Sequence, residues 1–144
     1  MIKLSKAQEE RAMRLHKEAI VVDTHCDTLM QFLPQSWGSP PARRLGERGD
    51  RGHLDLPRMI EGGVTCQTFA MYTGRRAFVP EAPLVAMQMV DKFYTEIDEN
   101  PEIVAVTKHD EIVKAKKEGK VCGLLSMEGA EPLMGDISAL RVYY

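Results

Sequence analysis

Apolar residues along the chain follow two patterns. Largely apolar runs of strand length predict three buried strands at 20–25 (IVVDTH), 64–72 (VTCQTFAMY) and 120–129 (KVCGLLSMEG). A further run, 102–106 (EIVAV), fits either a short strand or an extended connector. The segments between these runs are longer and more polar, so the chain reads as strands separated by helices.

In the intervening segments, apolar residues recur at helical spacing. This pattern predicts helices over 5–19, 80–100 and 108–118, a short helix through 56–63 and a last helix after Asp136. Ser5, Asp55 and Asp136 are expected at N-caps, because their side chains accept from exposed backbone N–H groups. The buried stripes are expected to include Ala12, Leu15 and Ala19 in the first helix, and Leu84, Met87, Val90 and Ile97 in the second.

Strands that alternate with helices imply right-handed βαβ units and a parallel sheet with both faces covered. We therefore expect an α/β fold of about three βα units, forming one incomplete domain over residues 1–144. The last helix reaches Tyr144 without a C-cap glycine, and three units leave open sheet edges. We expect partners for these edges in the same chain or in another, which leaves a homo-oligomer open.

Residues 34–53 are dense in proline, glycine and arginine and predict a long loop. Loops of this length in compact domains often cover active sites, so we place this loop on the active-site side. Its arginines are expected to be solvated, although they also suit attraction of a substrate carboxylate: Arg43, Arg44, Arg48 and Arg51.

Charge and composition exclude several classes of protein. The formal net charge is −2, and no basic stripe interleaved with aromatic residues is present, which argues against nucleic acid as a partner. No apolar window is long enough to span a bilayer, and the N-terminus lacks the features of a signal peptide. Three widely spaced cysteines in apolar runs indicate reduced, buried thiols, so we expect a cytoplasmic protein.

The candidate chemistry begins where the first strand ends. Strand alternation would place Asp23, His25 and Asp27 on one face, at the carboxyl end where parallel α/β folds carry their active sites. An imidazole and a carboxylate two residues apart can form half of a site for zinc or a similar ion, with Asp23 orienting a ligand. In the structural alternative, His25 only donates a hydrogen bond to Asp27 or to a carbonyl.

Glu128 follows the third predicted strand and precedes a glycine that permits a sharp turn. A carboxylate there could bridge two metal ions, cap a helix or lie in solvent, and Glu131 is a nearby competitor. The remaining histidines, His16, His53 and His109, are expected to be solvated or structural. Cys26 is expected to pack against apolar neighbours rather than bind.

Three segments in this order, VVDTHCDTL, HLDLPRMIEGGVTCQTFAMY and GLLSMEGAEPLMGDISALRVYY, resemble the membrane dipeptidase (renal dipeptidase) family, peptidase family M19. The resemblance implies the first part of a (β/α)8 amidohydrolase-type barrel. It implies two zinc ions and a metal-bridged water that hydrolyses dipeptides, often with a C-terminal D-residue. By this likeness His25 and Asp27 bind one zinc and the catalytic Glu128 bridges both. The remaining ligands and the substrate-binding residues belong to later strands, beyond Tyr144.

Two other functions stay open. One is a related amidohydrolase acting on another amide or on a lactone, although such enzymes usually begin with His-x-His. The other is a truncated, inactive paralogue that packs against another subunit. A barrel of this kind needs about 250 residues, so we expect the 144-residue chain alone to be inactive. Stoichiometric zinc binding separates the enzyme from the inactive paralogue.

Overall fold

The computed structural model describes residues 3–34, 43–74 and 79–144. Its strands β1 (Val22–Cys26), β2 (Cys66–Tyr72), β4 (Val121–Glu128) and β3 (Ile103–Ala105) form one sheet in the order β1-β2-β4-β3. Every neighbouring pair in this sheet is parallel, which confirms the predicted α/β class. Segment 102–106, which was predicted to be either a short strand or an extended connector, contributes β3, so the described sheet has four strands.

The helices other than α2 occur in the predicted places, and α2 was not predicted. They are α1 (Lys6–Glu18), α2 (Leu29–Phe32), α3 (Leu56–Glu61), α4 (Ala82–Asp98), α5 (His109–Lys117) and α6 (Ile137–Tyr143), with short 3-10 turns η2 (Val79–Glu81) and η3 (Glu131–Leu133). The side chains of Ser5, Asp55 and Asp136 accept backbone N–H groups at the starts of α1, α3 and α6, as predicted. None of the helices in the described ranges combines the length and apolar character needed to cross a membrane.

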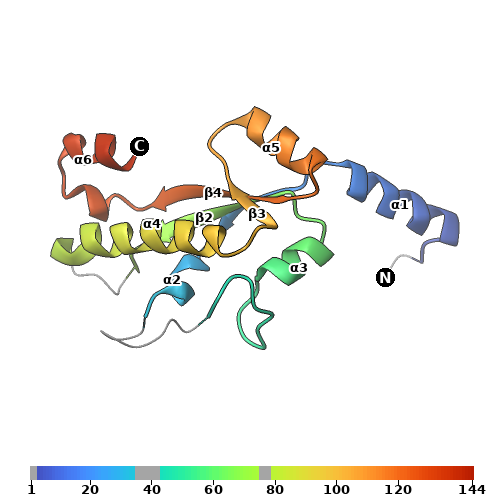
Figure 1. Cartoon of the computed structure of the whole chain (residues 1–144), viewed down its shortest axis with the longest axis horizontal. Coiled ribbons are helices and arrows are strands. Elements are labelled where there is room, and N and C mark those ends of the chain that lie inside the picture. The colour runs from blue at the N-terminus through green and yellow to red at the C-terminus, as the bar shows by residue number, and fades with distance from the viewer. Residues whose placement is uncertain (1–2, 35–42, 75–78) are drawn as a thin grey trace.

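Two apolar clusters hold the sheet between helices. The larger one joins α2 and α4 to β2 through residues such as Phe32, Phe69 and Phe93. The smaller one lies between α5 and the sheet and contains Cys66, Val106, Ala115 and Cys122. Alternate residues of a strand point to opposite faces, and Figure 1 shows α4 and α5 on opposite sides of the sheet.

The buried face of α4 is displaced by about one residue from the predicted stripe. Leu84 and Met87 are exposed, and Val90 and Ile97 are only partly buried against the core. The buried face instead contains Ala82, Ala86, Met89, Phe93 and Glu96. The buried face includes small residues and a charged residue, so a search for large apolar residues misplaces it.

The N-terminal segment was also predicted to be more buried than it is. Every residue of α1 is exposed, including Ala12 and Leu15, and Figure 1 shows α1 projecting from the sheet. In β1, Val22 to His25 are exposed and only Cys26 is partly buried. β1 lies at the edge of the sheet, so it has a strand neighbour on one side only.

The predicted loop 34–53 is described from residue 43 onward, and its residues 35–42 lie outside the described ranges. Arg48 and Arg51 are exposed, in agreement with the prediction, but Arg43 and Arg44 are held by protein groups and are not solvated as predicted. Arg43 donates to Gln31 Oε1 at 2.7 Å and to the Leu54 carbonyl at 2.9 Å. Arg44 pairs with Glu96 at 2.7 Å and also with Glu99. Arg48 pairs with Glu61, and only Arg51 has an almost fully exposed side chain.

Candidate metal centre

Side chains from two strands meet at the carboxyl edge of the sheet, from which the chain continues into η3 and α6 (Figure 1). His25 Nε2 lies 3.3 Å from Asp27 Oδ1 and 3.2 Å from Glu128 Oε2. Each of the three residues offers one potential ligand atom, and these atoms lie within 4.8 Å of one another. The side chains are about half exposed, at 52%, 50% and 44% for His25, Asp27 and Glu128. The three side chains are therefore partly open to solvent.

The predicted face-sharing of Asp23, His25 and Asp27 does not explain this cluster. The pairing of β1 with β2 is regular at Asp23 but shifts before Cys26, so simple alternation fails across His25. Asp27 lies just after the strand, where its carbonyl accepts the Met30 N–H at the start of α2. The two ligands come together because the strand is irregular and ends between them. Cys26 packs against the larger apolar cluster, as predicted.

Glu128, and not Glu131, is the acid that joins His25. Glu128 is the last residue of β4 and pairs in register with Tyr72 of β2. Gly129 follows with a φ of +84°, a conformation that side chains disfavour, and turns the chain away from the sheet. The Glu131 carboxylate lies against Gly129, and this residue is exposed. The structure thus separates Glu128, the candidate preferred from the sequence, from its near competitor Glu131.

The donor set fits a divalent cation. Tetrahedral zinc with bonds of about 2.0–2.1 Å separates its ligands by ~3.3 Å. His25 Nε2 is 3.3 Å from Asp27 Oδ1 and 3.2 Å from Glu128 Oε2, close to that spacing. Glu128 Oε2 is itself buried and receives no hydrogen bond from the described residues. A buried carboxylate oxygen without a donor is costly, and a cation would remove that cost.

The other histidines lie outside this cluster. His16 Nε2 contacts the Gly62 carbonyl at 2.7 Å and ties α1 to the end of α3, so it is more than a solvated side chain. His109 Nδ1 lies 3.1 Å from Asp110 Oδ1 at the start of α5, in agreement with the predicted structural role. His53 is exposed.

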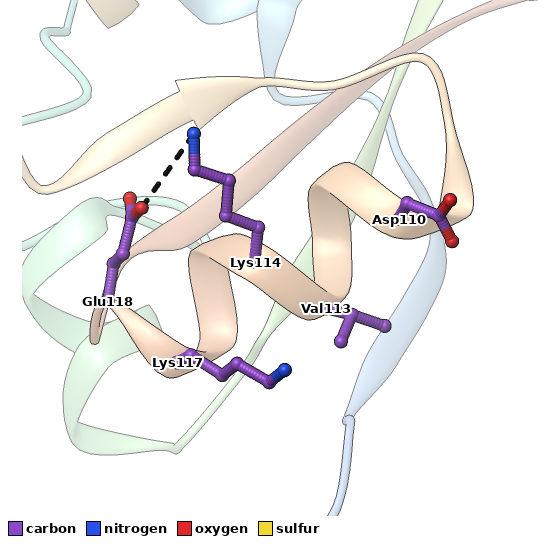
Figure 2. A pocket seen from close by; sticks show the side chains of 5 residues that line it. All are labelled: Asp110, Val113, Lys114, Lys117 and Glu118. Carbon is purple, nitrogen blue, oxygen red and sulfur yellow. Dashed lines mark ion pairs between the residues drawn. The ribbon is translucent and has the colours of Figure 1, made fainter.

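A depression on the outer side of α5 is a weaker candidate. Its lining residues come from α5 and from Glu118, the residue directly after this helix, and Lys114 and Glu118 form an ion pair at 3.9 Å (Figure 2). Asp110 and Lys117 point in different directions, and all the charged side chains are exposed. Among the described residues, the polar groups of this depression do not converge on a common position where a ligand could bind.

Comparison with known proteins identifies the family of the chain. A family model for membrane dipeptidases, peptidase family M19, matches residues 9–144. The chain belongs to this family. This confirms the predicted resemblance over nearly the whole chain.

Solved structures of M19 proteins share the fold. The dipeptidase AC, a metallopeptidase of family M19, superposes with a TM-score of 0.74 at 31% identity over 86% of this chain. A metallopeptidase from Rhodobacter sphaeroides, liganded with a phosphinate mimic of the dipeptide L-Ala-D-Ala, gives 0.73 at 26% identity over 86% of this chain. The probable dipeptidase PvdM from Pseudomonas aeruginosa gives 0.77 over 97% of the chain, but at 18% identity it supports only the fold.

The match covers only part of each solved structure. The chain spans 39%, 42% and 36% of the AC, Rhodobacter and Pseudomonas chains, respectively. Its parallel βα units therefore correspond to less than half of the dipeptidase fold, whose complete form in this family is a (β/α)8 barrel. The fold class predicted from the sequence is confirmed at this level.

Proposed function

We propose that the chain provides one side of the dinuclear zinc centre of a metallo-dipeptidase. In this proposal His25 and Asp27 bind one zinc ion, and Glu128 bridges that ion to a second one. The observation that carries the proposal is the convergence of three potential ligand atoms, from the ends of β1 and β4, within 4.8 Å. Membership of the M19 family supports the class of enzyme.

The roles of the three side chains follow from their chemistry. His25 offers Nε2, and Asp27 offers a carboxylate oxygen from the turn between β1 and α2. Glu128 has two carboxylate oxygens, one of which faces His25, so the other is free to contact a second ion. Bound zinc supplies a Lewis acid and lowers the pKa of a water molecule to near neutrality. The three residues hold this centre at the open edge of the sheet, where a small substrate has access.

The substrate class in this proposal is dipeptides, including those with a C-terminal D-residue. The solved relative that carries a mimic of L-Ala-D-Ala supports this choice. The second zinc's further ligands and the substrate-binding groups come from outside these 144 residues. We place the protein in the cytoplasm, which agrees with free cysteines at positions 26, 66 and 122.

The experiment compares two glutamates that lie three residues apart. The metal-free chain is titrated with zinc by calorimetry, as wild type, Glu128→Gln and Glu131→Gln. Wild type and Glu131→Gln should bind zinc stoichiometrically, because Glu131 is outside the cluster. Glu128→Gln should bind at least about 100-fold more weakly, since it loses an anionic ligand. Hydrolysis of L-Ala-D-Ala is then measured on any longer protein that contains this chain.

The outcomes separate the competing functions. Equal zinc affinity in all three proteins would remove Glu128 from the centre. No zinc binding by the wild type would favour the inactive paralogue. Zinc binding with hydrolysis of lactones or cyclic amides, and none of dipeptides, would assign a different amidohydrolase.

A further inference from the structure

The end of β1 contains an extra residue. Asp23 pairs with Gln67 of β2, and Cys26 pairs with Phe69, so three steps along β1 match two steps along β2. An insertion of this kind is a β-bulge, which interrupts the hydrogen-bonded ladder and redirects the side chains beside it. His25 lies inside the interrupted stretch. Its orientation toward Asp27 and Glu128 therefore depends on how the bulge is held.

A side chain replaces the missing ladder partner at this point. The His25 backbone N–H donates to Asp23 Oδ1 at 3.1 Å. A backbone N–H that leaves the ladder needs another acceptor, and a carboxylate oxygen is a strong one. Asp23 is exposed, and it is not a member of the ligand cluster among the described residues. Its contact is with the backbone of a ligand residue, not with the ligand atoms.

We propose that Asp23 is a positioning residue, whose carboxylate oxygen holds the β1 bulge and thereby aims the His25 imidazole at Asp27 and Glu128. This inference rests on the proposed function, because the orientation matters only if these side chains bind metal. In this inference, the hydrogen bond to the Asp23 carboxylate oxygen is what matters, and the negative charge is not. An asparagine at position 23 keeps that oxygen and loses the negative charge, whereas an alanine loses both.

The test uses zinc titration of the metal-free chain in four forms: wild type, Asp23→Ala, Asp23→Asn and Thr24→Ala. Thr24 is the exposed neighbour on the same strand and controls for general disturbance of β1. Asp23→Ala should weaken zinc binding by about 10–100-fold, as loss of a group that orients a ligand typically does. Asp23→Asn and Thr24→Ala should bind like the wild type. All four should keep the same melting temperature without metal, since Asp23 is exposed.

Amide hydrogen exchange at His25 gives a second measurement that needs no metal. Exchange should be about tenfold faster or more in Asp23→Ala than in wild type, and unchanged in Asp23→Asn. Equal zinc affinity and equal exchange in Asp23→Ala would overturn the inference. Equal weakening in Asp23→Asn and Asp23→Ala would also overturn it, by assigning the effect to charge. If the wild type binds no zinc, the proposed function fails, while the exchange rates still decide whether Asp23 holds the bulge.

Discussion

Two groups of acidic side chains in this molecule have opposite surroundings. Asp55 and Glu96 have almost no exposed surface, and donors surround each carboxylate. Asp55 accepts from the Gly49 N–H at 3.1 Å, from the Arg58 N–H at 3.0 Å and from Arg58 Nε at 2.8 Å. Asp27 and Glu128 are about half exposed and share a single imidazole between them.

The difference separates a structural carboxylate from one that is available to bind. Burial alone would raise the pKa of Asp55, but the hydrogen bonds from Arg58 and Gly49 outweigh it and hold the pKa below its usual value. Glu96 likewise accepts the Leu45 N–H at 2.8 Å and pairs with Lys92 at 2.8 Å. The carboxylates of Asp55 and Glu96 accept hydrogen bonds that anchor the loop after residue 43. Asp27 and Glu128 have fewer donors around them, so their oxygens remain available to a ligand.

Removal of a buried acid should produce the largest effect. Asp55→Ala leaves the Arg43 and Arg58 guanidinium groups without their buried partner, so the free energy of unfolding should fall by about 3–5 kcal/mol. Urea denaturation followed by circular dichroism measures this change. Asp50→Ala is the matched control, because Asp50 lies in the same loop with its side chain 93% exposed, and it should change little. Similar effects for the two substitutions would erase the distinction between the two groups of acids.

The difference in stability between wild type and Asp55→Ala should depend on pH, and the direction of this dependence follows from the pKa of Asp55. Because the folded pKa of Asp55 is below the unfolded value, its stabilisation is present above about pH 4 and is lost as the pH falls through the folded pKa. The wild type should therefore lose its advantage over Asp55→Ala in acid. A difference that stays constant down to pH 2 would contradict this assignment.

At the exposed acids, the stability of the folded chain should depend on added metal and not on the acids alone. Zinc at about 100 times its dissociation constant should raise the free energy of unfolding of the wild type by about 2.7 kcal/mol, because it binds only the folded chain. Excess chelator should remove the gain. Glu128→Gln should show almost none of it, yet should be at least as stable as wild type without metal, since one of two neighbouring negative charges is gone. A large loss of metal-free stability in Glu128→Gln would make Glu128 a structural acid like Asp55.

The sequence predicted the helices and strands well where local signals suffice. The caps at Ser5, Asp55 and Asp136 and the apolar runs of β2 and β4 required no information about distant residues. Glu128 and His25 were also predicted as partners, because carboxyl ends of parallel strands share one edge. Glu128 was preferred to Glu131 from the sequence, but the left-handed turn at Gly129, which a glycine permits but does not require, could not be predicted.

Long-range packing was the part that local patterns could not supply. The stripe of Leu84 and Met87 looks buried because both are large and apolar, but α4 presents Ala86 and Glu96 to its neighbours instead. Glu96 is buried because Arg44 and Lys92 come to it, and Arg44 lies about fifty residues earlier in the chain. The bulge in β1 depends on pairing with β2, so the alternation of the strand taken alone gave the wrong reason for the meeting of His25 and Asp27.

The buried thiol of Cys122 extends the comparison to an ionisable group whose pKa is governed mainly by burial. Burial, with a smaller contribution from Cys66, raises the pKa of the Cys122 thiol to about 11. This group is more basic folded than unfolded, so its stabilisation is complete below about pH 9 and declines as the pH rises toward the folded value. Wild type should lose up to about 1.4 kcal/mol per pH unit in this window relative to Cys122→Ala. Thermal melts from pH 8 to 10.5 measure it, and parallel curves for the two proteins would show that burial does not govern this thiol.

The smallest expected effect concerns the turn that sends Glu131 away from the cluster. Gly129→Ala should lower the free energy of unfolding by about 1–2 kcal/mol, because its φ of +84° disfavours a side chain. An added Cβ would also meet the Glu131 carboxylate, so part of the loss should disappear when Gly129→Ala is made in a Glu131→Ala background. Glu131→Ala alone should leave zinc affinity unchanged, since its carboxylate lies against the turn and not beside His25. Weaker zinc binding in Glu131→Ala would show that Glu131 also contributes to the metal site.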